Sequence, residues 1–174
     1  MPTLDLARSD LDTALTLNPQ IFWAYPEKIA LEILAARWVI TKDQAPEVYF
    51  DAAAAAASKA LAANPRNAVA YQSAAEINRW RAEHRLRQGL SIRADVREGR
   101  RLVERALALN PGLANALVTG AAITTVQAES ESAEATRRAL AAEADDALRR
   151  ALEINPDLER ETGELRRRIE AVSN

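Results

Sequence analysis

The chain carries one short signature, Ala-Leu-x-x-Asn-Pro, four times, and this repetition constrains the fold more than any other feature. The prolines of the four copies are separated by 46, 46 and 45 residues; they are Pro19, Pro65, Pro111 and Pro156. Even spacing of this length is typical of stacked helix pairs, in which each unit buries its apolar face against its neighbours. The sequence therefore predicts an array of helical units.

Each Asn-Pro pair is expected to end one helix and to begin the next. Asparagine tolerates the left-handed conformation just past the end of a helix, and the proline behind it cannot continue that helix. Each signature is therefore interpreted as the joint between the second helix of one unit and the first helix of the following unit.

Small residues occupy two positions of every copy, twelve and five residues before the proline, and an apolar residue lies between them. Positions seven apart share one face of a helix, so small residues there let a neighbouring helix approach closely. The small residues are Ala7, Ala14, Ala53, Ala60, Gly99, Ala106, Ala144 and Ala151, and the apolar residues are Leu11, Ala57, Val103 and Leu148.

We expect one all-α domain over residues 1–174, built as a right-handed α-solenoid of about eight helices without strands. Five glycines and a large excess of alanine favour helix over sheet. The units are expected to run over 1–19, 20–65, 66–111 and 112–156, followed by a capping helix in 157–174. The expected helices span 3–17, 20–41, a segment after Pro46, 67–88, 93–109, 113–128, 132–154 and 157–172.

Two of these helices have unusual compositions. The helix after Pro46 contains six consecutive alanines, Ala52–Ala57, and is expected to be a closely packed internal helix. The helix over 113–128 has no charged residue and is expected to be buried between neighbours. The alternative for this second helix is that one side lines an apolar groove open to a partner.

The composition argues against a catalytic or metal site. There is no cysteine, and His84 is the single histidine, expected to be exposed and without a functional role. We find no phosphate-binding glycine loop and no nucleophile elbow. Neither a signal peptide nor a membrane span is evident. These observations predict a cytoplasmic protein that is not an enzyme and needs no cofactor or metal.

The packing pattern, small-x6-small-x4-Pro followed six residues later by Tyr25 or Tyr71, resembles the second-helix half of a tetratricopeptide repeat. The units here are longer than the usual length of about 34 residues. The chain is also similar to the long-helix repeat arrays C-terminal to the catalytic domain of some large bacterial serine/threonine kinases. The first resemblance implies a solenoid whose first helices line a concave groove for a protein or peptide partner.

Carried over residue by residue, this resemblance implies groove positions in three first helices. The family's carboxylate clamp is not matched, because its positions hold Pro26, Ala30, Gln72 and Glu76, so binding of a chaperone C-terminal tail is not expected. The implied groove residues are Trp23, Gln72, Glu76, Arg79, Asn115, Val118 and Thr125.

Trp38 and Trp80 each follow an arginine at related places in the long first helices. One interpretation is that these rings fill the space created by the extra length of each repeat. The other is that they form aromatic walls of a peptide groove, since tryptophan and arginine often anchor interfaces. Both residues are therefore candidates for the partner-binding surface.

The segment Arg79–Arg101 contains eight arginines and three carboxylates, a local charge of +5, whereas the rest of the chain sums to −7. Such asymmetry can mark a surface for anions or nucleic acid. Several of the charged residues are four apart, which is equally typical of a solvated helix face with local ion pairs. The net charge of −2 and the pI near 5.6 weigh against nucleic acid.

We conclude from the sequence that the chain is a non-catalytic protein-interaction scaffold that binds a peptide or protein on its concave face. The alternative is a regulatory region that binds a small ligand or signalling peptide and controls an attached kinase domain. Nucleic-acid binding through the arginine segment is a third hypothesis. The sequence identifies neither the partner nor the oligomeric state.

Overall fold

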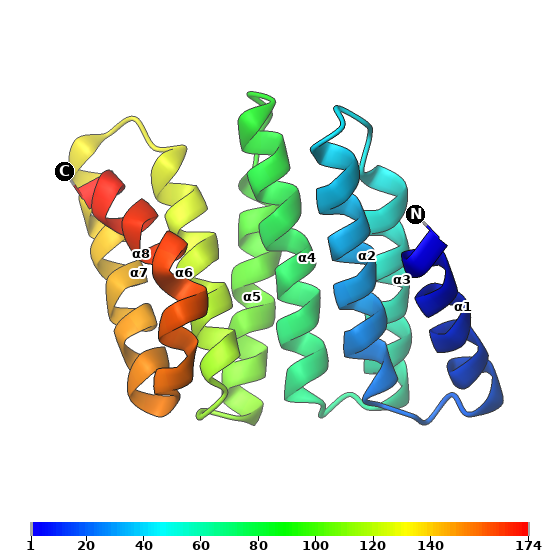
Figure 1. Ribbon diagram of the computed structural model, residues 1–174. Helices are drawn as coiled ribbons and strands as arrows, with labels where there is room; N and C mark the ends of the chain where they lie inside the picture. The colour runs from blue at the N-terminus through cyan, green and yellow to red at the C-terminus, as the bar shows by residue number, and fades with distance from the viewer. Residues whose placement is uncertain (1, 174) are drawn as a thin grey trace.

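The computed structural model describes residues 2–173, which form eight α-helices and one 3-10 turn and contain no strand (Figure 1). This confirms the predicted all-α class. The elements are α1 (Pro2–Leu17), α2 (Ala24–Ile40), α3 (Glu47–Ala63), α4 (Ala68–Arg87), α5 (Arg93–Leu109), α6 (Ala114–Glu129), α7 (Glu134–Ile154), η1 (Pro156–Leu158) and α8 (Glu159–Ser173).

All four Asn-Pro joints share the same hydrogen bonds. The asparagine N–H donates to the alanine carbonyl four residues earlier, at 2.9 to 3.0 Å in Asn18, Asn64, Asn110 and Asn155. The asparagine side-chain oxygen accepts the backbone N–H two residues later, at 3.0 to 3.2 Å. Because asparagine supplies both the last helical N–H and the acceptor for the turn, each copy of the signature builds the same corner.

The expected left-handed conformation of these asparagines is wrong. Asn64, Asn110 and Asn155 are extended, with φ of −145°, −143° and −139°. The proline ring clashes with helical and left-handed backbone in the residue before it and favours the extended region. The left-handed residues lie instead at the ends of α2 and α4, at Asp43 with φ of 53° and Gly89 with φ of 67°. Gly89 thus terminates α4 as predicted.

Three predicted helix starts differ from the structure by two residues or more. Helix α2 starts at Ala24 instead of residue 20, because a turn occupies the residues after Pro19 and places Pro26 in the first helical turn. Helix α7 starts at Glu134 instead of 132, and the last helix is preceded by the 3-10 turn Pro156–Leu158.

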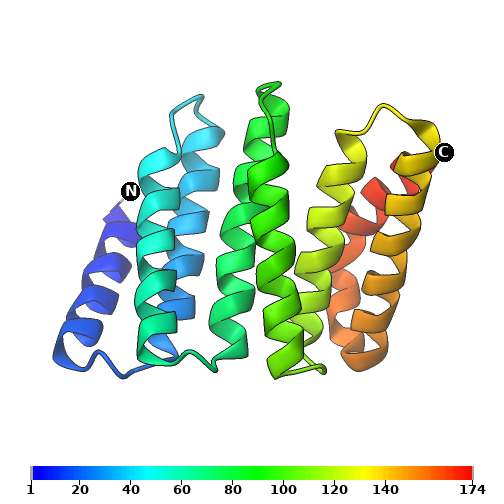
Figure 2. The same ribbon diagram turned by 180° about the vertical axis from the view of Figure 1, so that it is seen from behind.

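The helices form two layers. The first helices α2, α4, α6 and α8 pack side by side in one layer, seen from the front in Figure 1. The other layer contains α3, α5 and α7, seen in Figure 2, and within residues 2–173 no Cα atom of α5 lies within 8 Å of one in α3 or α7. Long side chains still bridge α5 and α7, as in the ion pair of Arg100 with Glu143. Because the first helices lie closer together than the second helices, the stack is a solenoid that is concave on the first-helix side.

The predicted packing positions form the contacts between the layers. Ala53, Gly99 and Ala144, twelve residues before the prolines, are all buried. Ala60, Ala106 and Ala151, five residues before the prolines, are buried too. The equivalent residues of α1 are only half-buried, and the backbone of α1 lies close to that of α2 alone among the described helices.

The two helices of unusual composition behave differently. Helix α6 is buried along nearly its whole length between α4, α5, α7 and α8, which confirms the first interpretation. In the alanine run only Ala53, Ala56 and Ala57 are buried, whereas Ala55 is exposed. The run is therefore internal on one side only.

Candidate functional site

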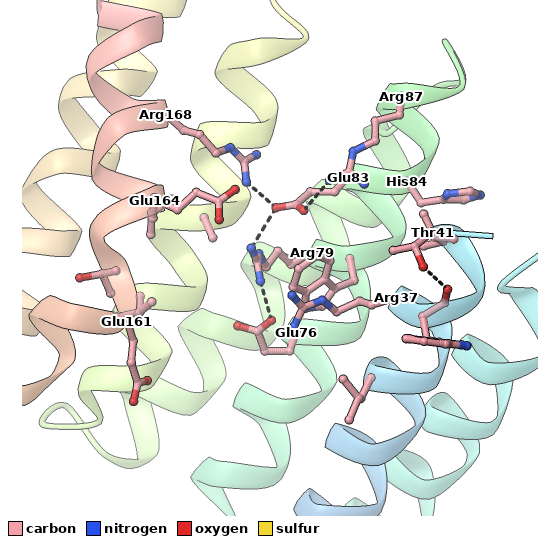
Figure 3. Close-up of a pocket in the computed structure, with 18 residues that line it drawn as sticks. Arg37, Thr41, Glu76, Arg79, Glu83, His84, Arg87, Glu161, Glu164 and Arg168 are labelled. Carbon is pink, nitrogen blue, oxygen red and sulfur yellow. Dashed lines mark hydrogen bonds and ion pairs between the residues drawn. The ribbon is translucent and has the colours of Figure 1, made fainter. Parts of the chain in front are cut away.

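The concave face contains a hollow of about 690 Å³ that crosses all four first helices (Figure 3). We call it the concave hollow. Its lining comes from Leu34 to Thr41 of α2, Glu76 to Arg87 of α4, two residues of α6 and the segment from Glu161 to Arg168 of α8. The hollow exists because these helices are neighbours in space while their sequences are separated by whole repeats.

Apolar side chains are exposed on the α2 side of the concave hollow. Leu34 and Trp38 are each 49% exposed, one helical turn apart, and Lys42 Nζ lies 5.1 Å from the centre of the Trp38 ring. Exposing large apolar groups side by side costs hydration free energy, and such patches often mark interaction sites.

The Trp80 ring, unlike the exposed Trp38 ring, is contacted by the guanidinium groups of two arginines. The Cζ atoms of Arg37 and Arg79 lie 4.2 and 4.0 Å from its ring centre, which is cation–π distance. Trp80 is half-buried and packs against the main core cluster. It therefore combines the two interpretations of the sequence: the ring fills the space between α2 and α4, and its edge lines the hollow.

A buried carboxylate, Glu83, organises the charges at the bottom of the concave hollow. Its side chain is 4% exposed, and Oε1 lies 3.0 Å from Arg79 Nη2 and 2.7 Å from Arg168 Nη1. Arg87 Nη2 lies 3.7 Å from Oε2. A buried carboxylate is costly unless it is paired, and these guanidinium groups supply the pairing.

Arg168 joins α8 to two other first helices. Besides Glu83 of α4, it contacts Glu129 of α6 through two hydrogen bonds, Nε to Oε1 at 2.8 Å and Nη2 to Oε2 at 2.9 Å. Burial lowers the pKa of the Arg168 guanidinium, but the two carboxylates outweigh burial and raise its pKa above the usual value. The positive charge of Arg168 is therefore fixed.

The α8 side of the concave hollow is acidic. Glu161 and Glu164 are exposed on α8, and neither forms an ion pair with any residue in 2–173. Figure 3 shows both on the wall formed by α8, opposite Arg37. The hollow thus has an apolar and cationic wall on α2 and an acidic wall on α8.

The predicted groove residues fall into two groups. Trp38, Glu76, Arg79, Trp80 and Val118 line the concave hollow. The residues outside its lining are Trp23, Gln72, Asn115 and Thr125.

Trp23 is exposed at the turn before α2, and Asn115 is exposed near the start of α6. Gln72 Nε2 donates to Thr119 Oγ1 at 3.0 Å, so it joins α4 to α6. Thr125 is fully buried, and its hydroxyl donates to the Ala121 carbonyl at 2.8 Å. Thr125 is therefore unavailable to a partner.

The sequence reasoning missed Leu34, Arg37, Glu83 and the whole contribution of α8. For α8 a signal was present, since Pro156 continues the proline register and makes the segment behind it the first helix of a further unit. The residues themselves were not predictable this way, because the register gives Gly163, Arg167 and Glu170, none of which lines the concave hollow. No sequence signal identified Glu83, because a carboxylate among arginines reads equally well as a surface ion pair.

Six of the eight arginines in the segment Arg79–Arg101 are ion-paired among the described residues, but only Arg79, Arg87 and Arg101 have the expected local partners on their own helix. The other three pair with a different helix. Arg81 contacts Asp51 at 2.6 Å, Arg85 contacts Asp95 at 3.5 Å, and Arg101 contacts Glu98 at 2.6 Å. Arg100 pairs with Glu143. The exceptions are Arg93 and Arg97, which are exposed without an ion pair among the described residues.

Within residues 2–173 no group of three or more histidine, cysteine, aspartate or glutamate side chains is arranged to hold a metal ion. None of the helices in the same range is both long and apolar enough to cross a membrane. Comparisons of the chain with known protein families, with curated proteins and with solved structures found no match.

Proposed function

We propose that the protein is a non-catalytic, tetratricopeptide-like interaction scaffold of the cytoplasm that binds a peptide or protein segment in the concave hollow. The observation that carries this proposal is the exposure of Leu34 and Trp38 beside the buried Glu83 carboxylate and the arginines that pair with it. The apolar pair offers contact area, and these ion pairs keep the surrounding side chains in place before a partner arrives. A preformed surface of this kind loses little conformational entropy on binding.

The lining favours a peptide over a small ligand. Small-molecule sites are mostly apolar and bury nearly all of their ligand. The concave hollow is instead lined by alternating charged and apolar side chains from four helices, and the charged walls of α2 and α8 face each other. A polypeptide segment can place different side chains against each wall, which a small ligand cannot.

The experiment is an affinity capture from native lysate with three purified proteins. The parent is compared with Leu34→Ser/Trp38→Ser, which removes the apolar pair, and with Val48→Ser, which removes a side chain that is 67% exposed on α3 outside the hollow. Because all three side chains are exposed, both variants should fold like the parent, which circular dichroism checks.

We expect the parent and Val48→Ser to capture the same proteins and Leu34→Ser/Trp38→Ser to lose them. A partner retained equally by all three proteins would show that it binds elsewhere, and the concave hollow would no longer be its site.

A further inference from the structure

The second-helix face contains another hollow, of about 1140 Å³, between α5 and α7 and beside the turns α4–α5 and α6–α7. We call it the outer hollow. Figure 2 shows α5 and α7 on this side, opposite the layer that forms the concave hollow. It is therefore a separate surface, and nothing in the proposed function uses it.

The floor of the outer hollow is apolar. Val96 of α5, Leu140 of α7 and Ile92 at the start of α5 are all less than one-tenth exposed, and together they close its base. Leu90, in the turn before α5, stands at the edge and is 58% exposed. An apolar side chain from a partner would find hydrophobic contacts on both the floor and the edge.

Two arginines at the rim of the outer hollow occupy positions where a positive charge does not stabilise the fold. Arg93 is the first residue of α5, where the positive end of the helix dipole favours a carboxylate, and no side chain caps this end of the helix. Arg97 lies four residues further on the same face, and like charges at this spacing repel. Neither residue forms an ion pair within residues 2–173.

The neighbouring Arg100 and Arg101, in contrast, form ion pairs within the protein. Arg100 pairs with Glu143 of α7 and also donates to Gln127 Oε1 at 3.1 Å, and Arg101 pairs with Glu98. Their charges are therefore matched within the protein. Arg93 and Arg97 have no ion pair within residues 2–173, although the Arg97 charge acts on the nearby Glu98, and both stand beside an apolar floor, where an acidic partner would pair with them.

We propose that the outer hollow binds an acidic peptide segment that carries at least one large apolar side chain. The apolar side chain would pack against Leu90 and Val96, and the carboxylates would pair with Arg93 and Arg97. A peptide fits better than a nucleic acid, because it can confine its carboxylates to Arg93 and Arg97 and place uncharged residues beside Glu104 and Glu131, which also line the hollow. A continuous phosphate backbone could not avoid these two carboxylates and would be repelled by them.

The test measures fluorescence anisotropy of two labelled peptides of equal length, one built from leucine and aspartate and the other from leucine and lysine. We expect the parent to bind the acidic peptide about tenfold or more tightly than the basic one, and binding to weaken with salt. Arg93→Glu/Arg97→Glu should reverse this preference. Leu90→Ser should weaken binding of the acidic peptide.

One control tests whether the charge change alone alters the peptide preference, and a second tests whether the acidic peptide binds in the concave hollow instead. Arg160→Glu/Arg167→Glu makes the same charge change on exposed residues of α8 that have no ion pair among the described residues, and it should keep the acidic preference. Leu34→Ser/Trp38→Ser should also keep it. The thermal midpoint of Arg93→Glu/Arg97→Glu should be no lower than that of the parent, because the substitution relieves the helix dipole and the repulsion.

Absence of saturable binding of the acidic peptide to the parent would overturn the proposal. So would a preference that survives Arg93→Glu/Arg97→Glu. A single-stranded oligonucleotide that binds more tightly than the acidic peptide and is lost in the same variant would assign the outer hollow to nucleic acid.

Discussion

Gly99 lies in the middle of α5 at a point where α4, α5 and α6 meet. A Cβ at this position would lie 2.8 Å from Ile123 Cδ1 and 3.3 Å from the Asn78 Cβ. Ile123 is fully buried, so its side chain has little room to move. The equivalent residues of α3 and α7 are alanines, Ala53 and Ala144. Among these three helices, only α5 therefore has a residue without a side chain at this position.

We expect Gly99→Ala to lower the free energy of unfolding by about 1 kcal/mol, because the overpacking exceeds the gain of about 1 kcal/mol in helix propensity. In the Ile123→Val background, which lacks the Cδ1 atom, the same substitution should instead stabilise the protein. Urea unfolding of the four proteins of this double-mutant cycle measures the coupling. Strict additivity of the two substitutions would contradict the contact between Gly99 and Ile123.

The asparagines of the four Asn-Pro joints show what the sequence could and could not predict. It located the joints, but it did not predict the backbone conformation of the asparagines. The presence of Asn-Pro was enough to end each helix. The conformation of the asparagine was predicted incorrectly, because its tolerance of the left-handed region was weighed above the steric effect of the proline that follows it. The hydrogen bond from the N–H two residues later then fixed the turn.

Helix α5 shows how the packing pattern acts on a whole element. One face of it carries Gly99, Val103 and Ala106, which are buried against the first helices, and the opposite face carries charged residues. The pattern of small residues was readable in the sequence because every copy repeats it. Which of the charged residues on the other face would be paired was not readable, because their partners belong to other helices.

Ala106 gives the sharpest test of this face. It is fully buried, and we expect Ala106→Glu to destabilise the protein by about 3 kcal/mol or more, since a carboxylate would enter a contact that holds a methyl group. Ala108 is exposed two residues later on α5, and Ala108→Glu should change stability by less than about 0.5 kcal/mol. Thermal melting of both variants makes the comparison. Equal melting of the two would mean that the packed face has been assigned incorrectly.

At the scale of the whole molecule, α8 completes the concave face. It packs against α6 and α7, and its link to α4 is the ion pair between Arg168 and Glu83. This pair joins residues 85 positions apart and brings the acidic wall of Glu161 and Glu164 opposite the apolar wall of α2.

We expect Arg168→Met to destabilise the attachment of α8 by about 1 to 3 kcal/mol, because Glu83 and Glu129 each lose a charged hydrogen-bond donor. Hydrogen exchange should accelerate in α8 more than in α2 and α3, which lie far from the substitution. Arg167→Met serves as the control, because Arg167 is exposed and has no ion pair in the described part of the chain. Unchanged exchange in α8 would show that apolar packing alone holds this helix.

The sequence by itself determined the number of helices, the places where they end and the small residues on which they stack, because these depend on local sterics and on a pattern that is repeated in every unit. The tertiary structure decided which side chains meet across repeats. Glu83 among its arginines, the two guanidinium groups on Trp80 and the unpaired Arg93 and Arg97 all depend on residues distant in sequence. Pairing of this kind has no period, so no local pattern could predict it.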